Sequence, residues 1–256
     1  MSARPAASLS GVLDPDALLE SADCVLLDFD GPLCDLFAAR PATGVATELA
    51  ERLPGFGCDP QVAVSVAGDP LALLQAVFKH HGPGPTTSRA EEFLAREEIE
   101  AAGGATPTEH ARELVGALAA GGWKQAVTTN NTPAAVRRFL ERQRWSAPAA
   151  EHVHGRGPDP ALLKPDPHCL VRALESTGSD AATAVMIGDS CADFLAAQAV
   201  GVPFIGYAVS ERRRRVLEDV GARCTVRSLR GLAEVALRRA RSRQSGAGRL
   251  PIGVRG

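Results

Sequence analysis

Short apolar runs alternate with segments of helical periodicity along most of the chain. Apolar runs that end at turn residues predict buried strands, and the helical stretches between them predict crossovers joining parallel strands. We expect strands at Cys24–Phe29, Gln125–Thr129, Ala184–Ile187 and Val202–Ala208, with a weaker one at Arg223–Val226. The pattern therefore predicts an α/β fold built on a parallel sheet.

The segment 35–104 has a different pattern, because helical periods at 44–53, 71–81 and 88–102 are separated by loops rich in Gly and Pro. The short run Val62–Val66 fits either a strand or a helical turn. We expect a small helical unit inserted after the first strand, with residues 1–34 and 105–240 forming the core domain. Ser, Gly, Arg and Pro dominate residues 241–256, which predicts a disordered tail.

Composition narrows the class of protein. Hydrophobic residues make up 45% and charged residues 23% of the 256 positions, as in globular proteins with a buried core. With 28 basic and 30 acidic side chains the net charge is −2, so no global field favours nucleic acid or membrane as a partner. We expect Arg212–Arg215 to begin a solvated helix, because acidic residues lie nearby.

The six cysteines are scattered, which indicates reduced thiols rather than a disulfide framework. We see neither a signal peptide nor an apolar run near the roughly 20 residues that a membrane span needs. A cytoplasmic protein is therefore expected. The sequence gives no indication of the oligomeric state.

Polar residues stand where the predicted strands end, and ligand sites of such sheets lie beyond these carboxyl ends. Asp28 and Asp30 flank Phe29. Two carboxylates this close fit either the binding of a divalent cation or a nucleophile with an acid/base partner. They also fit an ordinary solvated turn. Asp189 stands at the end of a predicted strand, and we expect Asp193, four residues later, to lie one turn along the following helix on the same face. There they fit a metal site or merely favour the helix dipole.

Two further positions have chemistry suited to anions. Thr129 and Asn130 stand before a helix start at Thr132–Pro133, which fits an anion site or an ordinary capped turn. Lys164 lies between Leu163 and Pro165 in a stiff loop. It is either an ordinary solvent-exposed lysine or a point charge that binds a phosphate. It is one of only three lysines in a chain that otherwise uses arginine.

Taken together, these elements resemble the four motifs of the haloacid dehalogenase-like hydrolase superfamily, in chain order. The matching segments are Asp28–Leu33 (DxDGxL), Ala126–Asn130, Lys164–Pro165 and Gly188–Asp193 (GDSxxD). The resemblance covers about Cys24 to Arg230 and implies a Rossmann-like core. The place of the insertion resembles the helical cap of the branch that includes phosphoglycolate phosphatase and β-phosphoglucomutase.

The resemblance implies a phosphatase that acts on a small phosphorylated metabolite through an aspartyl-phosphate. Asp28 is then the nucleophile and Asp30 the general acid and base, a residue that favours phosphate esters over other chemistry of the superfamily. A mutase of the β-phosphoglucomutase type uses the same motifs and stays open. A non-catalytic binding protein on this scaffold is a third alternative, although none of the motif carboxylates is missing.

The resemblance also implies the ligands. Mg²⁺ is expected as the cofactor, held by Asp28, the backbone carbonyl of Asp30 and Asp189, with Asp193 completing or supporting the site. Thr129, Asn130 and Lys164 are expected to bind the phosphoryl group. Thr128 makes the register of the second motif ambiguous, and we choose Thr129 because Asn follows it.

Overall fold

The computed structural model describes residues 13–64, 66, 68–145 and 151–247. Its centre is a six-stranded parallel sheet with the order β5-β4-β1-β6-β7-β8. The strands are β1 (Cys24–Leu27), β4 (Lys124–Thr128), β5 (Val153–His154), β6 (Ala184–Gly188), β7 (Phe204–Tyr207) and β8 (Thr225–Val226). The α/β prediction with a parallel sheet is confirmed. Only β5 was not expected, because two residues form no recognisable apolar run.

Helices cover both faces of the sheet, and the alternation of side chains along each strand explains why. Val25 and Leu27 pack into one hydrophobic cluster and Leu26 into another. The first cluster lies under α1 (Pro15–Ser21), α6 (Ala111–Gly121), α7 (Pro133–Gln143) and α11 (Arg230–Ala247). The second lies under α8 (His168–Thr177), α9 (Cys191–Val200) and α10 (Glu211–Asp219). Buried on both faces, β1 needs a continuous apolar sequence.

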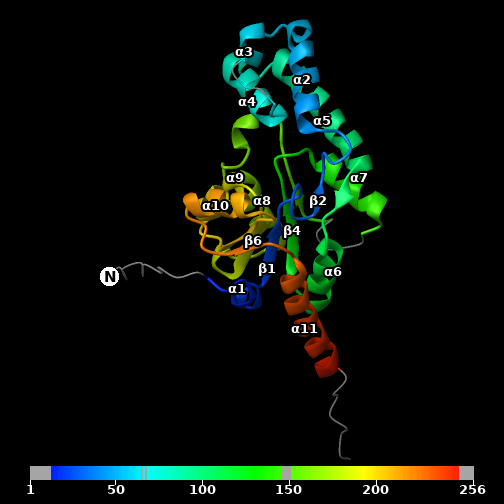
Figure 1. Cartoon of the computed structure of the whole chain (residues 1–256), viewed down its shortest axis with the longest axis vertical. Coiled ribbons are helices and arrows are strands. Elements are labelled where there is room, and N and C mark those ends of the chain that lie inside the picture. The colour runs from blue at the N-terminus through cyan, green and yellow to red at the C-terminus, as the bar shows by residue number, and fades with distance from the viewer. Residues whose placement is uncertain (1–12, 65, 67, 146–150, 248–256) are drawn as a thin grey trace, which may run out of the picture.

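The segment that follows β1 forms a helical insertion, which Figure 1 shows beyond one end of the sheet. It contains α2 (Ala42–Arg52), the 3₁₀ turn η1 (Leu53–Phe56), α3 (Pro60–Val64), α4 (Pro70–His81) and α5 (Pro85–Gly104). A separate hydrophobic cluster holds these helices together, with Leu49, Leu74 and Phe93 among its buried members. The run at Val62 is therefore helical as far as Val64, while residue 65 lies outside the described residues.

Two short strands mark where the chain enters and leaves the helical insertion. They are β2 (Cys34–Asp35) and β3 (Thr106–Pro107), which pair antiparallel. Further contacts tie the insertion to the core, since α5 packs on α7 and α4 meets η3 (Pro160–Leu162). A last 3₁₀ turn, η4 (Ala181–Thr183), precedes β6. The division of the chain into domains at 34/35 and 104/105 stays a prediction, and residues 1–12 lie outside the described part.

The expectation of a disordered tail from residue 241 is wrong for residues 241–247, which continue α11. Arginine and glutamine at positions 241, 243 and 244 favour helix, and the hydroxyls of Ser242 and Ser245 are satisfied by carbonyls four residues earlier. Such a polar stretch lacks the apolar period that the sequence analysis relied on. Residues 248–256 lie outside the described residues.

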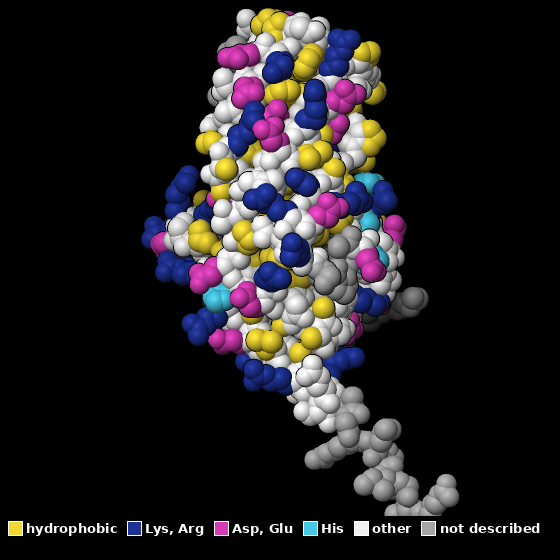
Figure 2. Space-filling view, turned by 90° about the vertical axis from the view of Figure 1, so that its right-hand side faces the viewer, with side chains coloured by type: hydrophobic (Ala, Val, Ile, Leu, Met, Phe, Trp, Pro, Cys, Tyr) yellow, Lys and Arg dark blue, Asp and Glu magenta, His cyan; other side chains and the backbone are white. Residues whose placement is uncertain are grey.

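Charged side chains of both signs are interspersed over the face of the molecule seen in Figure 2. The cluster Arg212–Arg215 lies on α10, as expected for a solvated helix, and Arg214 pairs with Glu211 and Glu218. Among the helices of the described residues, none is both long and apolar enough to cross a membrane.

Candidate active site

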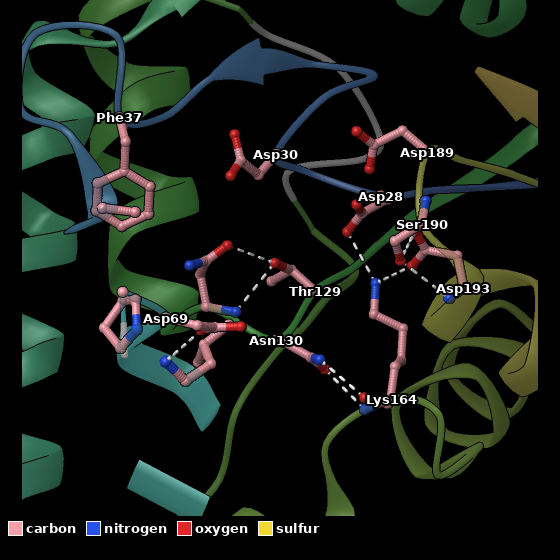
Figure 3. Close-up of a pocket in the computed structure, with 15 residues that line it drawn as sticks. Asp28, Asp30, Phe37, Asp69, Thr129, Asn130, Lys164, Asp189, Ser190 and Asp193 are labelled. Carbon is pink, nitrogen blue, oxygen red and sulfur yellow. Dashed lines mark hydrogen bonds and ion pairs between the residues drawn. The ribbon is translucent and has the colours of Figure 1, made fainter. Parts of the chain in front are cut away.

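Polar residues from several strand ends meet the helical insertion around a cavity of about 380 Å³ (Figure 3). Every residue predicted from the sequence for catalysis, phosphate or metal lines it: Asp28, Asp30, Thr129, Asn130, Lys164, Asp189 and Asp193. The insertion contributes Phe37, Ala42, Gly68, Asp69, Pro70 and Leu71, none of which the sequence analysis selected. The parallel sheet explains the convergence, because β4, β1 and β6 are neighbours and end at one edge.

A tight turn after β1 brings the first two aspartates to this edge. Gly31 has a φ of +103°, and a Cβ there would lie 2.5 Å from the Asp189 Cγ. Glycine is therefore needed both for the backbone conformation and for the close approach of Asp189. Beyond the turn, the Leu36 N–H donates to Asp30 Oδ1 at 2.9 Å, which orients that carboxyl group.

Lys164 lies at the centre of the site, with 4% of its surface exposed. Its Nζ donates to Asp28 Oδ1 at 2.8 Å, to Asp193 Oδ1 at 2.5 Å and to the Thr128 carbonyl at 3.0 Å. A buried ammonium with three acceptors has its full set of hydrogen bonds. Lys164 is therefore a buried residue of the site and not a solvent-exposed surface lysine.

The side chain of Asn130 fixes the backbone on which Lys164 stands. Its Oδ1 accepts from the Lys164 N–H at 2.8 Å, and its Nδ2 donates to the Lys164 carbonyl at 3.0 Å. This pair of bonds joins the loop after β4 to the loop that precedes α8. Asn130 thus positions the lysine, and direct contact of Asn130 with phosphate stays a prediction.

Thr129 and Thr128 have distinct surroundings. The Thr129 hydroxyl donates to Asn131 Oδ1 and accepts from the Asn131 N–H, both at 3.1 Å, at the cavity wall. The Thr128 side chain is fully buried, and only its carbonyl reaches Lys164. The structure thus brings Thr129 rather than Thr128 to the cavity, while its role toward phosphate stays a prediction.

Three carboxylates form a candidate metal site. Asp28, Asp189 and Asp193 each offer an oxygen, and these oxygens lie within 4.8 Å of one another. Asp193 also closes a capping box, since its Oδ2 accepts from the N–H and the hydroxyl of Ser190 at 3.0 and 2.7 Å. Both carboxylate oxygens of Asp193 thus accept hydrogen bonds from the protein. This suits a residue that supports the metal ligands rather than one that binds the metal alone. Asp189 pairs with Arg213 of α10 at 2.6 Å, a contact that the sequence analysis missed.

Burial and mutual repulsion strain this cluster electrostatically. Burial first, and then the charge of Asp193, hold the pKa of Asp28 well above its usual value and raise the pKa of Asp189 to about 7. Burial also raises the pKa of Asp30 to about 6, against the opposing hydrogen bond from Leu36. For Lys164 burial lowers the pKa, but Asp193 and Asp28 outweigh it and leave the pKa raised.

Hard oxygen donors that repel one another are the environment that a divalent cation such as Mg²⁺ stabilises. The donor set therefore fits the expected metal. The contribution of the Asp30 carbonyl oxygen stays a prediction.

A buried ion pair that the sequence analysis missed supports the loop after β4. Glu98 of α5 accepts from Arg156 Nη1 and Nη2 at 2.7 and 2.9 Å, and from Asn131 Nδ2 at 3.1 Å and the Thr132 N–H at 2.8 Å. Arg156 Nη1 also donates to the Asn130 carbonyl at 2.9 Å. The sequence did contain a sign of this buried pair. Glu98 stands four residues after Leu94, on the apolar face of α5, where a charged residue needs a buried partner.

Comparisons with known proteins identify relatives of this chain. The haloacid dehalogenase-like hydrolase family model matches residues 22–201. A phosphoglycolate phosphatase of Rhodospirillum rubrum is 38% identical over 193 residues, which cover 71% of this chain and 77% of that protein. A phosphoglycolate phosphatase of Caulobacter vibrioides is 30% identical over 216 residues, 80% of this chain and 86% of the relative.

Solved structures show the same fold at low sequence identity. A predicted phosphatase from Clostridium acetobutylicum superposes with a TM-score of 0.61 at 20% identity, covering 85% of this chain and 99% of the other. A putative phosphoglycolate phosphatase from Lactobacillus plantarum gives a TM-score of 0.59 at 19% identity, with coverages of 84% and 99%. From the match of the family model and the identity to the relatives, this chain belongs to the haloacid dehalogenase-like hydrolases.

Proposed function

We propose that the protein is a Mg²⁺-dependent phosphatase that hydrolyses a small phosphate monoester through an aspartyl-phosphate on Asp28. The observation that carries this proposal is the contact of Lys164 with Asp28 inside a cavity that Asp30 and Asp189 also line. A carboxylate held beside a buried ammonium, with an acid two residues away, has the parts needed for phosphoryl transfer. The relatives named phosphoglycolate phosphatase support a phosphatase.

In the first step an oxygen of the Asp28 carboxylate attacks phosphorus, and the bond from phosphorus to the ester oxygen breaks. Asp30 gives its proton to the departing oxygen, which leaves as an alcohol. Lys164 places positive charge beside Asp28 and the phosphoryl oxygens, while Asn130 keeps its backbone in place.

In the second step Asp30, now ionised, takes a proton from water. The oxygen of that water attacks phosphorus and the bond to Asp28 breaks, which releases inorganic phosphate and restores both carboxyl groups. Thr129 lines the same cavity and, in this proposal, its hydroxyl turns from Asn131 Oδ1 to donate a hydrogen bond to the phosphoryl oxygens. Each proton taken up in one step is returned in the other, so the cycle is balanced.

Asp28 and Asp189 would hold the metal ion, and Asp193 would support them through Lys164 and Ser190. When bound, Mg²⁺ supplies the positive charge that lets an anionic carboxylate approach an anionic phosphate. A binding protein without catalysis has no need of this set, in which nucleophile, acid and metal carboxylates all line one cavity.

A panel of phosphate monoesters tests the proposal. We expect Mg²⁺-dependent release of phosphate from some member, loss of release with a chelator, and loss in Asp28→Asn. The matched control is Asp23→Asn, an exposed aspartate next to the opposite end of β1, which keeps full activity. A mutase would instead turn over a sugar phosphate with little free phosphate. Full activity of Asp28→Asn would refute the assignment.

A further inference from the structure

The cavity has two walls of opposite character. The loops beyond the sheet supply the polar wall with Asp28, Lys164 and Asp189. The helical insertion supplies the other wall with Phe37, Ala42, Gly68, Asp69, Pro70 and Leu71. In Figure 3, Phe37 and Asp69 lie on one side of the view, and Asp189 and Asp193 on the other. A substrate with its phosphoryl group at Asp28 therefore places its leaving group against the wall of the insertion.

Acidic side chains outnumber basic ones in this cavity. Five aspartates line it, and among the described lining residues Lys164 is the only cation. The three N–H groups of that ammonium already donate to Asp28, Asp193 and the Thr128 carbonyl. The sequence from 60 to 70, which leads into the wall of the insertion, contains no Lys, Arg or His. A second anionic group on the substrate finds no cationic side chain there.

The start of α4 cannot replace such a side chain. Asp69 Oδ1 accepts from the N–H groups of Leu71 and Ala72 at 2.9 and 3.2 Å, and the Leu73 N–H donates to the Asp69 carbonyl. Pro70 has no N–H. The N–H groups of this first turn are thus already used, and a full negative charge stands in front of them.

The start of α2 is the feature of this wall, within the described residues, that favours an anion. Ala42 begins that helix, and Pro41 before it provides no side-chain cap. A helix start is equivalent to roughly half a positive charge. The carboxylate of Asp69, which caps the start of α4 in the same wall, opposes this attraction for a ligand that contacts both.

The remaining surface of this wall suits carbon and hydroxyl groups. Phe37, Pro70 and Leu71 offer apolar contact, and the exposed carboxylate of Asp69 accepts hydrogen bonds. The volume of about 380 Å³ falls within the usual range for small-molecule sites, roughly 300–1,000 Å³.

We infer that the leaving group is an uncharged, hydroxyl-bearing alcohol, and that Asp69 selects against substrates with a second anionic group such as a carboxylate. This inference rests on the proposed phosphatase function and names the substrate class for the same site.

Two compounds of similar shape test it: 2-phosphoglycolate, which has a carboxylate, and 2-hydroxyethyl phosphate, which has a hydroxymethyl group in its place. We expect kcat/KM for the neutral ester to be higher, on the order of tenfold, because the carboxylate of 2-phosphoglycolate is repelled by Asp69 and by the other aspartates of the cavity. The same comparison extends across the panel, between esters with and without a carboxylate.

Asp69→Asn separates charge from structure, because asparagine caps a helix start as well as aspartate does. We expect this variant to change the ratio of kcat/KM between the two esters several-fold in favour of 2-phosphoglycolate. Asp59→Asn is the control, since Asp59 makes the same kind of bond to the Gln61 N–H and does not line the cavity. It leaves the ratio unchanged.

A preference for carboxylated esters, or a ratio that Asp69→Asn does not move, overturns the inference and leaves the phosphatase proposal intact. Absence of phosphate release from the whole panel overturns the phosphatase proposal itself.

Discussion

Arg156 holds Glu98 with both of its terminal nitrogens, at 2.7 and 2.9 Å, and neither side chain is exposed to solvent. The pair joins α5 of the helical insertion to the loop that follows β5. Through Asn131 and the Asn130 carbonyl it also joins both to the loop that includes Thr129. The position of the predicted phosphate-binding loop therefore depends on two residues outside the four motifs.

Glu98→Gln removes the charge that balances Arg156 inside the protein. We expect the free energy of unfolding to fall by up to about 3–5 kcal/mol, because the buried Arg156 loses its closer carboxylate and keeps only the partly exposed Glu91, at 3.3 Å, as a charged partner. Urea denaturation measures this change, and kcat should fall with it as the loop of Thr129 loosens. Glu92→Gln, an exposed site on the same helix, should change stability by less than about 0.5 kcal/mol. Equal stability of the two variants would contradict the account.

Lys164→Gln removes the ammonium that contacts Asp28 and Asp193. We expect kcat to fall by about 10²–10³, the usual loss when a charge-stabilising donor is removed from an active site. Lys164→Arg should not restore activity, because a guanidinium does not fit a site built for a compact ammonium. Lys124→Gln is the control at the opposite end of β4, where Lys124 donates to the Gly178 carbonyl. Full activity of Lys164→Gln would show that this lysine is structural.

Mg²⁺ should stabilise the folded protein, because the cation relieves repulsion among Asp28, Asp189 and Asp193. At a concentration about 100 times its Kd the expected gain is about 2.7 kcal/mol, seen as a rise in Tm. Asp189→Asn should lose most of that rise, while Asp180→Asn, an exposed site before β6, should keep it. A wild-type Tm that Mg²⁺ leaves unchanged would argue against the metal site.

Gly31→Ala tests the turn that places Asp30. The added Cβ meets Asp189 at 2.5 Å in a backbone conformation with φ of +103°. We expect a stability loss of about 1–3 kcal/mol and a loss of activity as Asp189 is displaced. Gly44→Ala in α2 has open space around it and should gain about 0.5–1 kcal/mol. Similar behaviour of both variants in thermal unfolding would refute the special role of Gly31.

Much of the core could be predicted from the sequence, because buried parallel strands leave unbroken apolar runs such as Val25–Leu27. Asp28 and Asp189 follow neighbouring parallel strands, which end at one edge of the sheet, so their grouping followed from topology. Lys164 stands in the loop before α8, and only the order of the motifs predicted its place. β5 and the last turns of α11 were missed, since neither has an apolar period.

The wall of the insertion and the support of the site depend on contacts that local patterns do not encode. Glu98 and Arg156 are 58 residues apart in the chain, and each alone resembles a surface residue. Asp69 carries an ordinary helix-cap signal, and nothing in that signal places it at the cavity. Arg213 belongs to a run of arginines on a solvated helix, and nothing in the sequence distinguishes it from its neighbours. Its contact with Asp189 therefore could not be predicted.

The central claim is that Asp28 becomes phosphorylated. The most direct measurement is to quench turnover with acid, treat the protein with borohydride and map the peptide containing Asp28 by mass spectrometry. Borohydride reduces an aspartyl-phosphate to homoserine and leaves free aspartate unchanged. We predict homoserine at position 28 in the presence of substrate and Mg²⁺, and aspartate at Asp30 and Asp189. Unmodified Asp28 during rapid phosphate release, or homoserine at another position, would contradict the mechanism.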